Sequence, residues 1–177
     1  MLSEWWKPRT PLGIIAQPWL ADEAIQYLET LVQPDDIVLE FGAGGSTLWF
    51  AHHAKLVISF ENNPKWLKRV KELAPRNVVL IERDEYKGNI LPDISEYDIL
   101  FIDGDPVILR GEWLKSARSL VKSGGLVVLD NSNRPEFAEE RAEFAKHAHL
   151  LKRFDNNINC KQIISHYFVT EFWKLCE

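Results

Sequence analysis

Short apolar runs alternate with amphipathic stretches along the chain. The runs are four or five residues long and apolar at nearly every position, and they cover residues 37–41, 56–60, 78–81, 99–102 and 126–129. Continuous runs of this length are typical of strands that are buried on both faces, as in a parallel sheet covered by helices. The pattern therefore predicts five buried strands.

Between these runs, apolar residues recur at helical spacing. Helices are predicted over residues 18–32, 46–54, 64–73, 111–121 and 135–147. Pro64 lies in a first helical turn, and Gly124 and Gly125 follow the fourth predicted helix as a stop signal. Strands that alternate with helices indicate right-handed crossovers.

The C-terminal part has strand character at residues 149–154 and 163–173, separated only by a short loop. We expect these two strands to form an antiparallel hairpin at one edge of the sheet. The predicted fold class is therefore α/β: a doubly wound, mostly parallel sheet with helices on both faces and an antiparallel edge hairpin, as in Rossmann-like folds.

The length of 177 residues corresponds to a single domain with its own core, so we predict one domain over residues 1–177. Residues 1–17 contain two adjacent tryptophans and are too apolar to float free. They are expected to form an N-terminal arm folded over the domain.

The composition argues against some classes of protein. The chain is 46% apolar and 27% charged, as in globular proteins, and its net charge of −5 argues against a nucleic-acid-binding surface. No apolar run reaches the roughly 18 residues of a membrane span. Cys160 and Cys176 lack metal-type spacing, so we interpret them as reduced thiols of a cytoplasmic protein.

One stretch, "EFGAGGST" at residues 40–47, concentrates glycines after the first strand. Glycine is used where φ is positive or where something approaches the backbone closely, so the stretch is either a bare turn or a ligand site. A phosphate-binding P-loop would need a lysine, and a dinucleotide fingerprint would need a glycine at Thr47. An acid, Glu40, followed by Gly42, Gly44, Gly45 and Ser46 suits a ligand that carries a cationic group and no phosphate.

Acidic residues also follow the other predicted strands. They are Glu61 with Asn62 next to it, Asp84, Asp103 and Asp130. In open α/β sheets, ligands bind beyond the carboxyl ends of the strands. Glu61, nineteen residues after Gly42, could accept hydrogen bonds from two ribose hydroxyls, and Asp84 could accept one from an adenine amino group. Each could equally be a solvated acid at a strand end, but acids at five tips together indicate an enzyme.

From residue 35 to 131 the chain resembles the class I S-adenosylmethionine-dependent methyltransferases, with Ser46 in place of their third glycine. "YDILFIDG" and "LVKSGGLVVLDN" are similar to segments of small bacterial O-methyltransferase-like proteins. The resemblance implies S-adenosylmethionine as cofactor and transfer of its methyl group to a small-molecule acceptor, at oxygen. The implied cofactor-binding residues are Glu40, Gly42, Gly44, Gly45, Ser46, Thr47, Glu61, Asn62, Asp84 and Asp103. A non-catalytic cofactor-binding or scaffold protein is the alternative. We expect the methyl acceptor as a partner, and we expect neither nucleic acid nor a membrane. Whether the protein forms a homodimer stays open.

Asp103, Asp130 and Asn131 are similar to the metal-binding trio of catechol and caffeoyl-CoA type O-methyltransferases. This resemblance implies a Mg²⁺ site and makes Asp103 and Asp130 the candidate catalytic residues, since a hard cation prefers oxygen ligands. The lysine that this family carries three residues after its first acid is Pro106 here. The other interpretation is that Asp103 borders the cofactor and that Asp130 and Asn131 form a turn.

Overall fold

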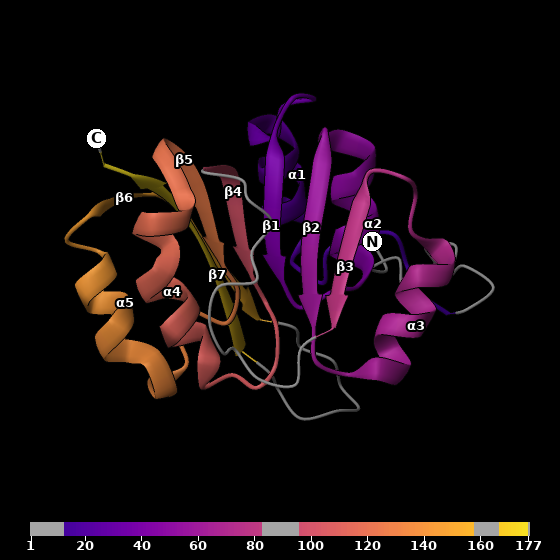
Figure 1. Ribbon diagram of the computed structural model, residues 1–177. Helices are drawn as coiled ribbons and strands as arrows, with labels where there is room; N and C mark the ends of the chain where they lie inside the picture. Colours follow the sequence, from indigo (N-terminus) through magenta and orange to yellow (C-terminus); the bar gives the residue numbers. More distant parts are fainter. Residues whose placement is uncertain (1–12, 83–95, 158–166, 177) are drawn as a thin grey trace.

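The chain folds around one seven-stranded sheet with the strand order β3-β2-β1-β4-β5-β7-β6 (Figure 1). This computed structural model describes residues 13–82, 96–157 and 167–176. The strands are β1 (Ile37–Phe41), β2 (Leu56–Glu61), β3 (Val78–Glu82), β4 (Tyr97–Ile102), β5 (Val121–Leu129), β6 (Ala148–Asn157) and β7 (Tyr167–Leu175). β1 to β5 pair in parallel, and β7 pairs antiparallel with both β5 and β6. The predicted fold class is confirmed.

Helices cover both faces of this sheet. They are α1 (Asp22–Leu31), α2 (Gly45–His53), α3 (Pro64–Leu73), α4 (Leu109–Leu120), the 3₁₀ helix η1 (Pro135–Phe137) and α5 (Ala138–Phe144). In Figure 1, α4 and α5 lie in front of the sheet, α1 and α2 lie behind it, and α3 flanks the β3 edge. Among the residues described, no helix is long and apolar enough to cross a membrane.

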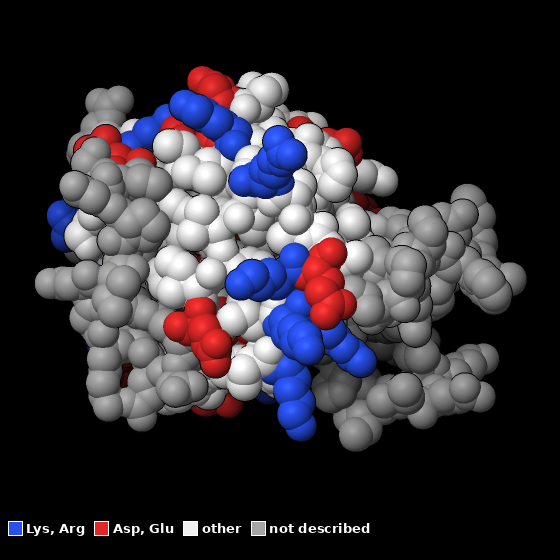
Figure 2. All heavy atoms as spheres, turned by 45° about the vertical axis from the view of Figure 1, so that its right-hand side comes forward, with Lys and Arg blue, Asp and Glu red and all other residues white. Residues whose placement is uncertain are grey.

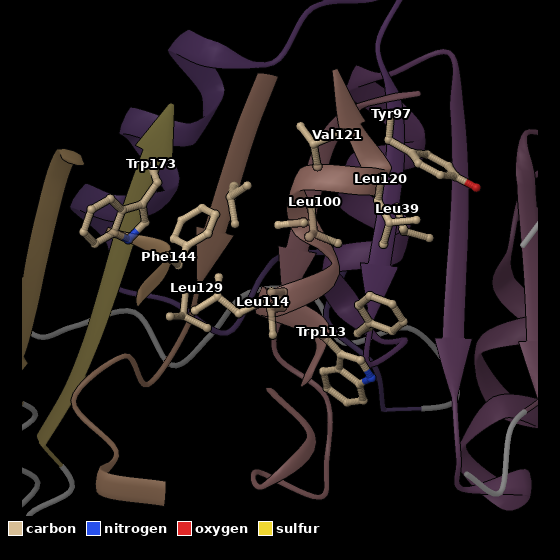
Figure 3. Packing of buried hydrophobic residues seen from close by; sticks show 14 of the residues in the cluster. Leu39, Tyr97, Leu100, Trp113, Leu114, Leu120, Val121, Leu129, Phe144 and Trp173 are labelled. Carbon is tan, nitrogen blue, oxygen red and sulfur yellow. The ribbon is translucent and has the colours of Figure 1, made fainter. Parts of the chain in front are cut away.

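The two-sided covering explains why the strands read as continuous apolar runs. On β1, Leu39 and Phe41 belong to the core beneath α4, whereas Val38 belongs to the core beneath α1 and α2. Figure 3 shows the first of these cores, with Trp113 from α4 and Trp173 from β7 on opposite sides of it. Both faces of each central strand are therefore buried, and neither face needs polar residues.

The predicted element bounds differ most from the structure at three places. α1 begins at Asp22 rather than at residue 18. The helix predicted over residues 135–147 is a 3₁₀ turn followed by a short α-helix that ends at Phe144. β5 already begins at Val121, directly after α4, so Gly124 and Gly125 lie within a strand rather than in a loop.

The described part of the predicted N-terminal arm packs on the domain. Ile14 is buried against Ala43, Leu48 and Val70, at the junction of the glycine stretch, α2 and α3. Residues 1–12 lie outside the described part. The arm over residues 1–17 stays a prediction.

Candidate functional site

The candidate site lies at the carboxyl ends of the parallel strands. The chain runs outward from β1 to β2 and β3, then returns to pair β4 with the other side of β1. This reversal creates a topological switch point between β1 and β4, the place where open α/β sheets bind ligands. The glycine stretch follows β1 at this point, and Asp103 follows β4.

Glu40 lies beneath the glycine stretch with no exposed surface. Its carboxylate accepts hydrogen bonds from the hydroxyls of Ser46, of Thr47 at 2.5 Å and of Ser59 at 2.6 Å. Burial raises the pKa of Glu40 to about 7, although these hydroxyls oppose the shift. Glu40 therefore ties the start of α2 to β1 and β2, and the expected direct contact with a cationic ligand group is not supported by its position. The hydroxyls of Ser46 and Thr47 likewise point toward Glu40, within the protein.

Gly42 is required by the protein itself. Its φ of +103° is in the region that favours glycine. A Cβ on Gly42 would lie 2.5 Å from Cα of Gly104, and a Cβ on Gly104 would lie 3.0 Å from the backbone of Phe41 and Gly42. The loops after β1 and β4 are thus held in direct backbone contact.

Gly45 and Gly44 differ in what surrounds them. A Cβ on Gly45 would collide with the carbonyl oxygens of Ile15 and Gln17, so the arm occupies that space. Gly44 has extended φ, and in the described part of the chain a Cβ there would meet only the indole of Trp66, at 3.8 Å. Trp66 in turn donates from Nε1 to the carbonyl of Ala43 at 2.6 Å. Gly44 is therefore the glycine of this stretch whose lack of a side chain is not explained by contacts with the residues that the structure describes.

Glu61 and Asn62, at the tip of β2, border the same loop. The Glu61 carboxylate accepts the N–H of Asn63 at 2.7 Å. Burial raises the pKa of Glu61, while backbone hydrogen bonds from Asn63, Ala43 and Asn62 lower it. Asn62 donates to the carbonyl of Asp105 at 2.9 Å and so links the β2 and β4 tips. Asp84 lies outside the described residues.

The tips of β4 and β5 are joined by Arg110, which no sequence motif indicated. This guanidinium, 3% exposed, donates to the carbonyls of Asp103 at 2.5 Å, Gly104 at 3.0 Å and Asp130 at 2.7 Å. It also donates to the Asp103 carboxylate at 3.2 Å and lies 3.9 Å from that of Asp130. A fixed planar fork of donors suits this role, and lysine could not make all these bonds.

The Asp130 carboxylate forms its hydrogen bonds within the protein. Its carboxylate accepts from Thr170 of β7 at 2.8 Å and from the side chain of Asn131 at 2.6 Å. Asn131 has φ +52° and closes a turn in which its carbonyl accepts the N–H of Arg134. The turn interpretation of Asp130 and Asn131 thus fits the structure. Next to them, the buried Ser132 hydroxyl has no partner among the described residues.

These contacts do not fit the metal site suggested by the sequence. Burial and then the charge of Asp130 raise the pKa of Asp103 well above its usual range. Thr170 and the Asn131 amide already donate to the Asp130 carboxylate, and Arg110 lies against both carboxyl groups, where a hard cation would have to bind. Arg110 therefore already supplies the positive charge, and the prediction of Mg²⁺ at Asp103, Asp130 and Asn131 is not supported.

No family model and no curated protein matches the sequence. Solved structures do match the fold. Precorrin 8w decarboxylase of Methanobacterium thermoautotrophicum has a TM-score of 0.63 at 19% identity, over 89% of this chain and 91% of that one. N-methyltransferase NodS of Bradyrhizobium japonicum has 0.67 at 12%, over 88% and 96%. TYW2 of M. jannaschii, in complex with AdoMet, has 0.57 at 16%, over 90% and 80%.

These likenesses define the architecture. The seven strands of this chain, with their antiparallel β7, form the Rossmann-like fold that the matched methyltransferase also has. At such low identity the comparisons establish the fold alone. The activity has to be argued from the residues at the strand tips.

Proposed function

We propose that this protein is an S-adenosylmethionine-dependent methyltransferase. The observation that carries the proposal is the open backbone at Gly44. It lies at the switch point of the sheet, and among the described residues beyond its chain neighbours only the Trp66 indole comes within 4 Å of where its Cβ would be. One matched structure is named an N-methyltransferase and another holds AdoMet, which supports the same cofactor here.

Several residues fit this cofactor. Gly44 leaves room for it beside the Trp66 indole, and the half-exposed Glu61 carboxylate can accept hydrogen bonds from ribose hydroxyls. When bound, the cofactor supplies an activated methyl group. Glu40, Ser46 and Thr47 hold the loop in place from beneath, which is a positioning role.

The acceptor would bind at the tips of β4 and β5. Asp103, with its side chain 27% exposed, is the acid of the pair that an acceptor can reach, whereas Asp130 is buried. We propose a small-molecule acceptor that is methylated at oxygen, with Asp103 at the acceptor and Asp130 positioning it. Arg110 holds both tips, and Gly104 keeps them against the cofactor loop. Much of the catalysis is then positioning of the acceptor.

Titration calorimetry with S-adenosylmethionine, S-adenosylhomocysteine and NAD tests the cofactor. We expect the first two to bind and NAD not to bind. Glu61→Ala should weaken S-adenosylhomocysteine binding by roughly 1.5–3 kcal/mol, the contribution of a charged hydrogen bond. Glu82→Ala, at the neighbouring β3 tip, is the matched control. Binding of NAD alone, or unchanged affinity in Glu61→Ala, would contradict the assignment.

A cofactor-binding protein without catalysis is the second candidate, because the described tips offer no obvious general base apart from Asp103. Both candidates predict binding, so binding cannot separate them. Transfer of labelled methyl from S-adenosylmethionine to a panel of small hydroxyl compounds can. Transfer that disappears in Asp103→Asn while the cofactor still binds would establish the enzyme.

A further inference from the structure

The outer face of α3 carries an unusual concentration of positive charge. Residues 64–76 contain five basic side chains and one acidic one, a net charge of +4 within a chain whose total is −5. The basic residues are Lys65, Lys68, Arg69, Lys71 and Arg76, and all five are exposed. Figure 2 turns this side of the molecule forward and shows Lys and Arg side chains gathered on it. We call these five residues the α3 basic face.

The helix orients these charges together. Trp66, Leu67, Val70 and Leu73 face inward, and the four cations of the helix share the remaining surface with Glu72. Within the described ranges, none of the five basic side chains forms an ion pair. Acidic residues elsewhere do find partners, such as Glu112 with Lys115 and Glu143 with Lys146. The charges of the α3 basic face are therefore available to an external anion.

The chemistry of the face favours one kind of partner. Protein interfaces have apolar or aromatic anchors at their centre, and helices that lie on membranes bury an apolar face. Along residues 64–76 the only exposed apolar side chains are Pro64 and Pro75. Interfaces with nucleic acids are polar and strongly positive, because most contacts go to phosphates.

We propose that the α3 basic face binds a nucleic-acid strand through its phosphates. The sequence-based expectation of no nucleic acid came from the total charge, which does not show where the charges lie. The face also adjoins the candidate site, since Trp66 of the same helix donates to Ala43 of the glycine stretch. A strand on α3 thus runs within about one helix diameter, roughly 10 Å, of Gly44. The proposal requires neither cofactor binding nor methyl transfer to the strand.

Fluorescence anisotropy with a 20-nucleotide single-stranded RNA, and with DNA of the same sequence, tests it without cofactor. Five phosphate contacts on a single strand predict a slope of about −3.5 in log K against log salt, or about 100-fold weaker binding at 200 mM than at 50 mM salt. Replacing Lys65, Lys68, Arg69 and Lys71 with Gln should weaken binding at least tenfold at 50 mM salt and reduce the slope to about −0.7.

The control variant replaces four exposed cations elsewhere, Lys55, Arg118, Lys152 and Lys174, with Gln. It changes the net charge equally and should bind like the wild type. Thermal melts establish that both variants are folded, and paired variants (Lys65 with Arg69, Lys68 with Lys71) replace the quadruple one if it is not. The proposal is overturned if neither strand binds at 50 mM salt, if both variants weaken binding equally, or if poly-glutamate competes as well as RNA. Because no cofactor is present, these failures leave the proposed methyl transfer untouched.

Discussion

The β1–β2 tips and the β4–β5 tips lie at one edge of the same sheet, yet different groups stabilise the acidic side chains of the two pairs. Beneath the first pair, Glu40 is surrounded by neutral hydroxyls and its pKa rises to about 7. At the second pair, Asp103 and Asp130 are held by a buried guanidinium. Neutral donors leave the loop above Glu40 open at Gly44, whereas Arg110 fills the space between the β4 and β5 tips. The first pair leaves space at Gly44, and the second pair is held rigidly, with only the Asp103 carboxylate partly exposed.

Removing Arg110 should give the largest effect. Arg110→Met leaves two carboxyl groups and three carbonyls without their partner, and we expect a loss of about 3–5 kcal/mol in the free energy of unfolding, as for other broken buried ion pairs. Arg110→Lys should be intermediate because it keeps the charge and loses the fork. Urea unfolding measures both, and exposed Arg118→Met serves as control. A loss below 1 kcal/mol in Arg110→Met would show that the tips hold together without it.

The raised pKa of Glu40 should make stability depend on pH. Between pH 4.5 and about 7 the folded state keeps a proton that the unfolded state releases, so the free energy of unfolding decreases as pH rises, by up to about 3 kcal/mol. Glu40→Gln stays uncharged and should flatten this decrease. Asp103 contributes in the same direction, so Asp103→Asn is the comparison. Equal slopes for wild type and Glu40→Gln would show that the folded protein does not raise the pKa of Glu40.

The two glycines of the loop should separate stability from binding. Gly42→Ala forces a positive φ and a collision with Gly104, and should cost about 2–3 kcal/mol of stability. Gly44→Val should leave stability within about 1 kcal/mol, the range of mild substitutions, and abolish binding of S-adenosylhomocysteine. Chemical unfolding and calorimetry read the two effects separately. Normal binding by a folded Gly44→Val protein would mean that the loop is only a turn.

Adding or removing a divalent metal ion should have the smallest effect on the protein and its activity. Because Arg110 already supplies positive charge to Asp103 and Asp130, a titration followed by electron paramagnetic resonance should show no Mn²⁺ bound at this site. Methyl transfer to an identified acceptor should be the same with and without EDTA. Stoichiometric Mn²⁺ binding that disappears in Asp130→Ala would restore the metal interpretation and remove the contrast between the two pairs of tips.

The sequence carried most of the fold because its determinants are local. The runs at residues 37–41 and 99–102 are apolar throughout, and such runs have few alternatives to a two-faced strand. The sequence does not show the start of α1 or the break at η1, because Pro18 is a favourable first helical residue and because an apolar stripe runs through residues 135–147, including the 3₁₀ turn. Packing, not periodicity, ends those elements.

The site was less accessible to sequence reasoning. The glycine stretch and the acids after the strands were found, but their partners are distant in sequence. Arg110 lies in the second position of α4 with no pattern around it, and its bonds reach Asp130, twenty residues away. Thr170 reaches Asp130 from forty residues away. Only the paired strands bring these groups together, so a motif that matched a metal trio could not reveal that a guanidinium already occupies its place.

The hydrogen bond from Trp66 to Ala43 has a spectroscopic consequence. The indole is half-buried beside Gly44, so its fluorescence reports the polarity of the space above the glycine. The chain has six other tryptophans, so the part of a ligand-induced change that Trp66→Phe removes is the part that reports on this loop. The difference spectrum between the wild type and Trp66→Phe therefore isolates a single chromophore at the loop. Occupancy of the loop can then be followed in real time with an unlabelled protein.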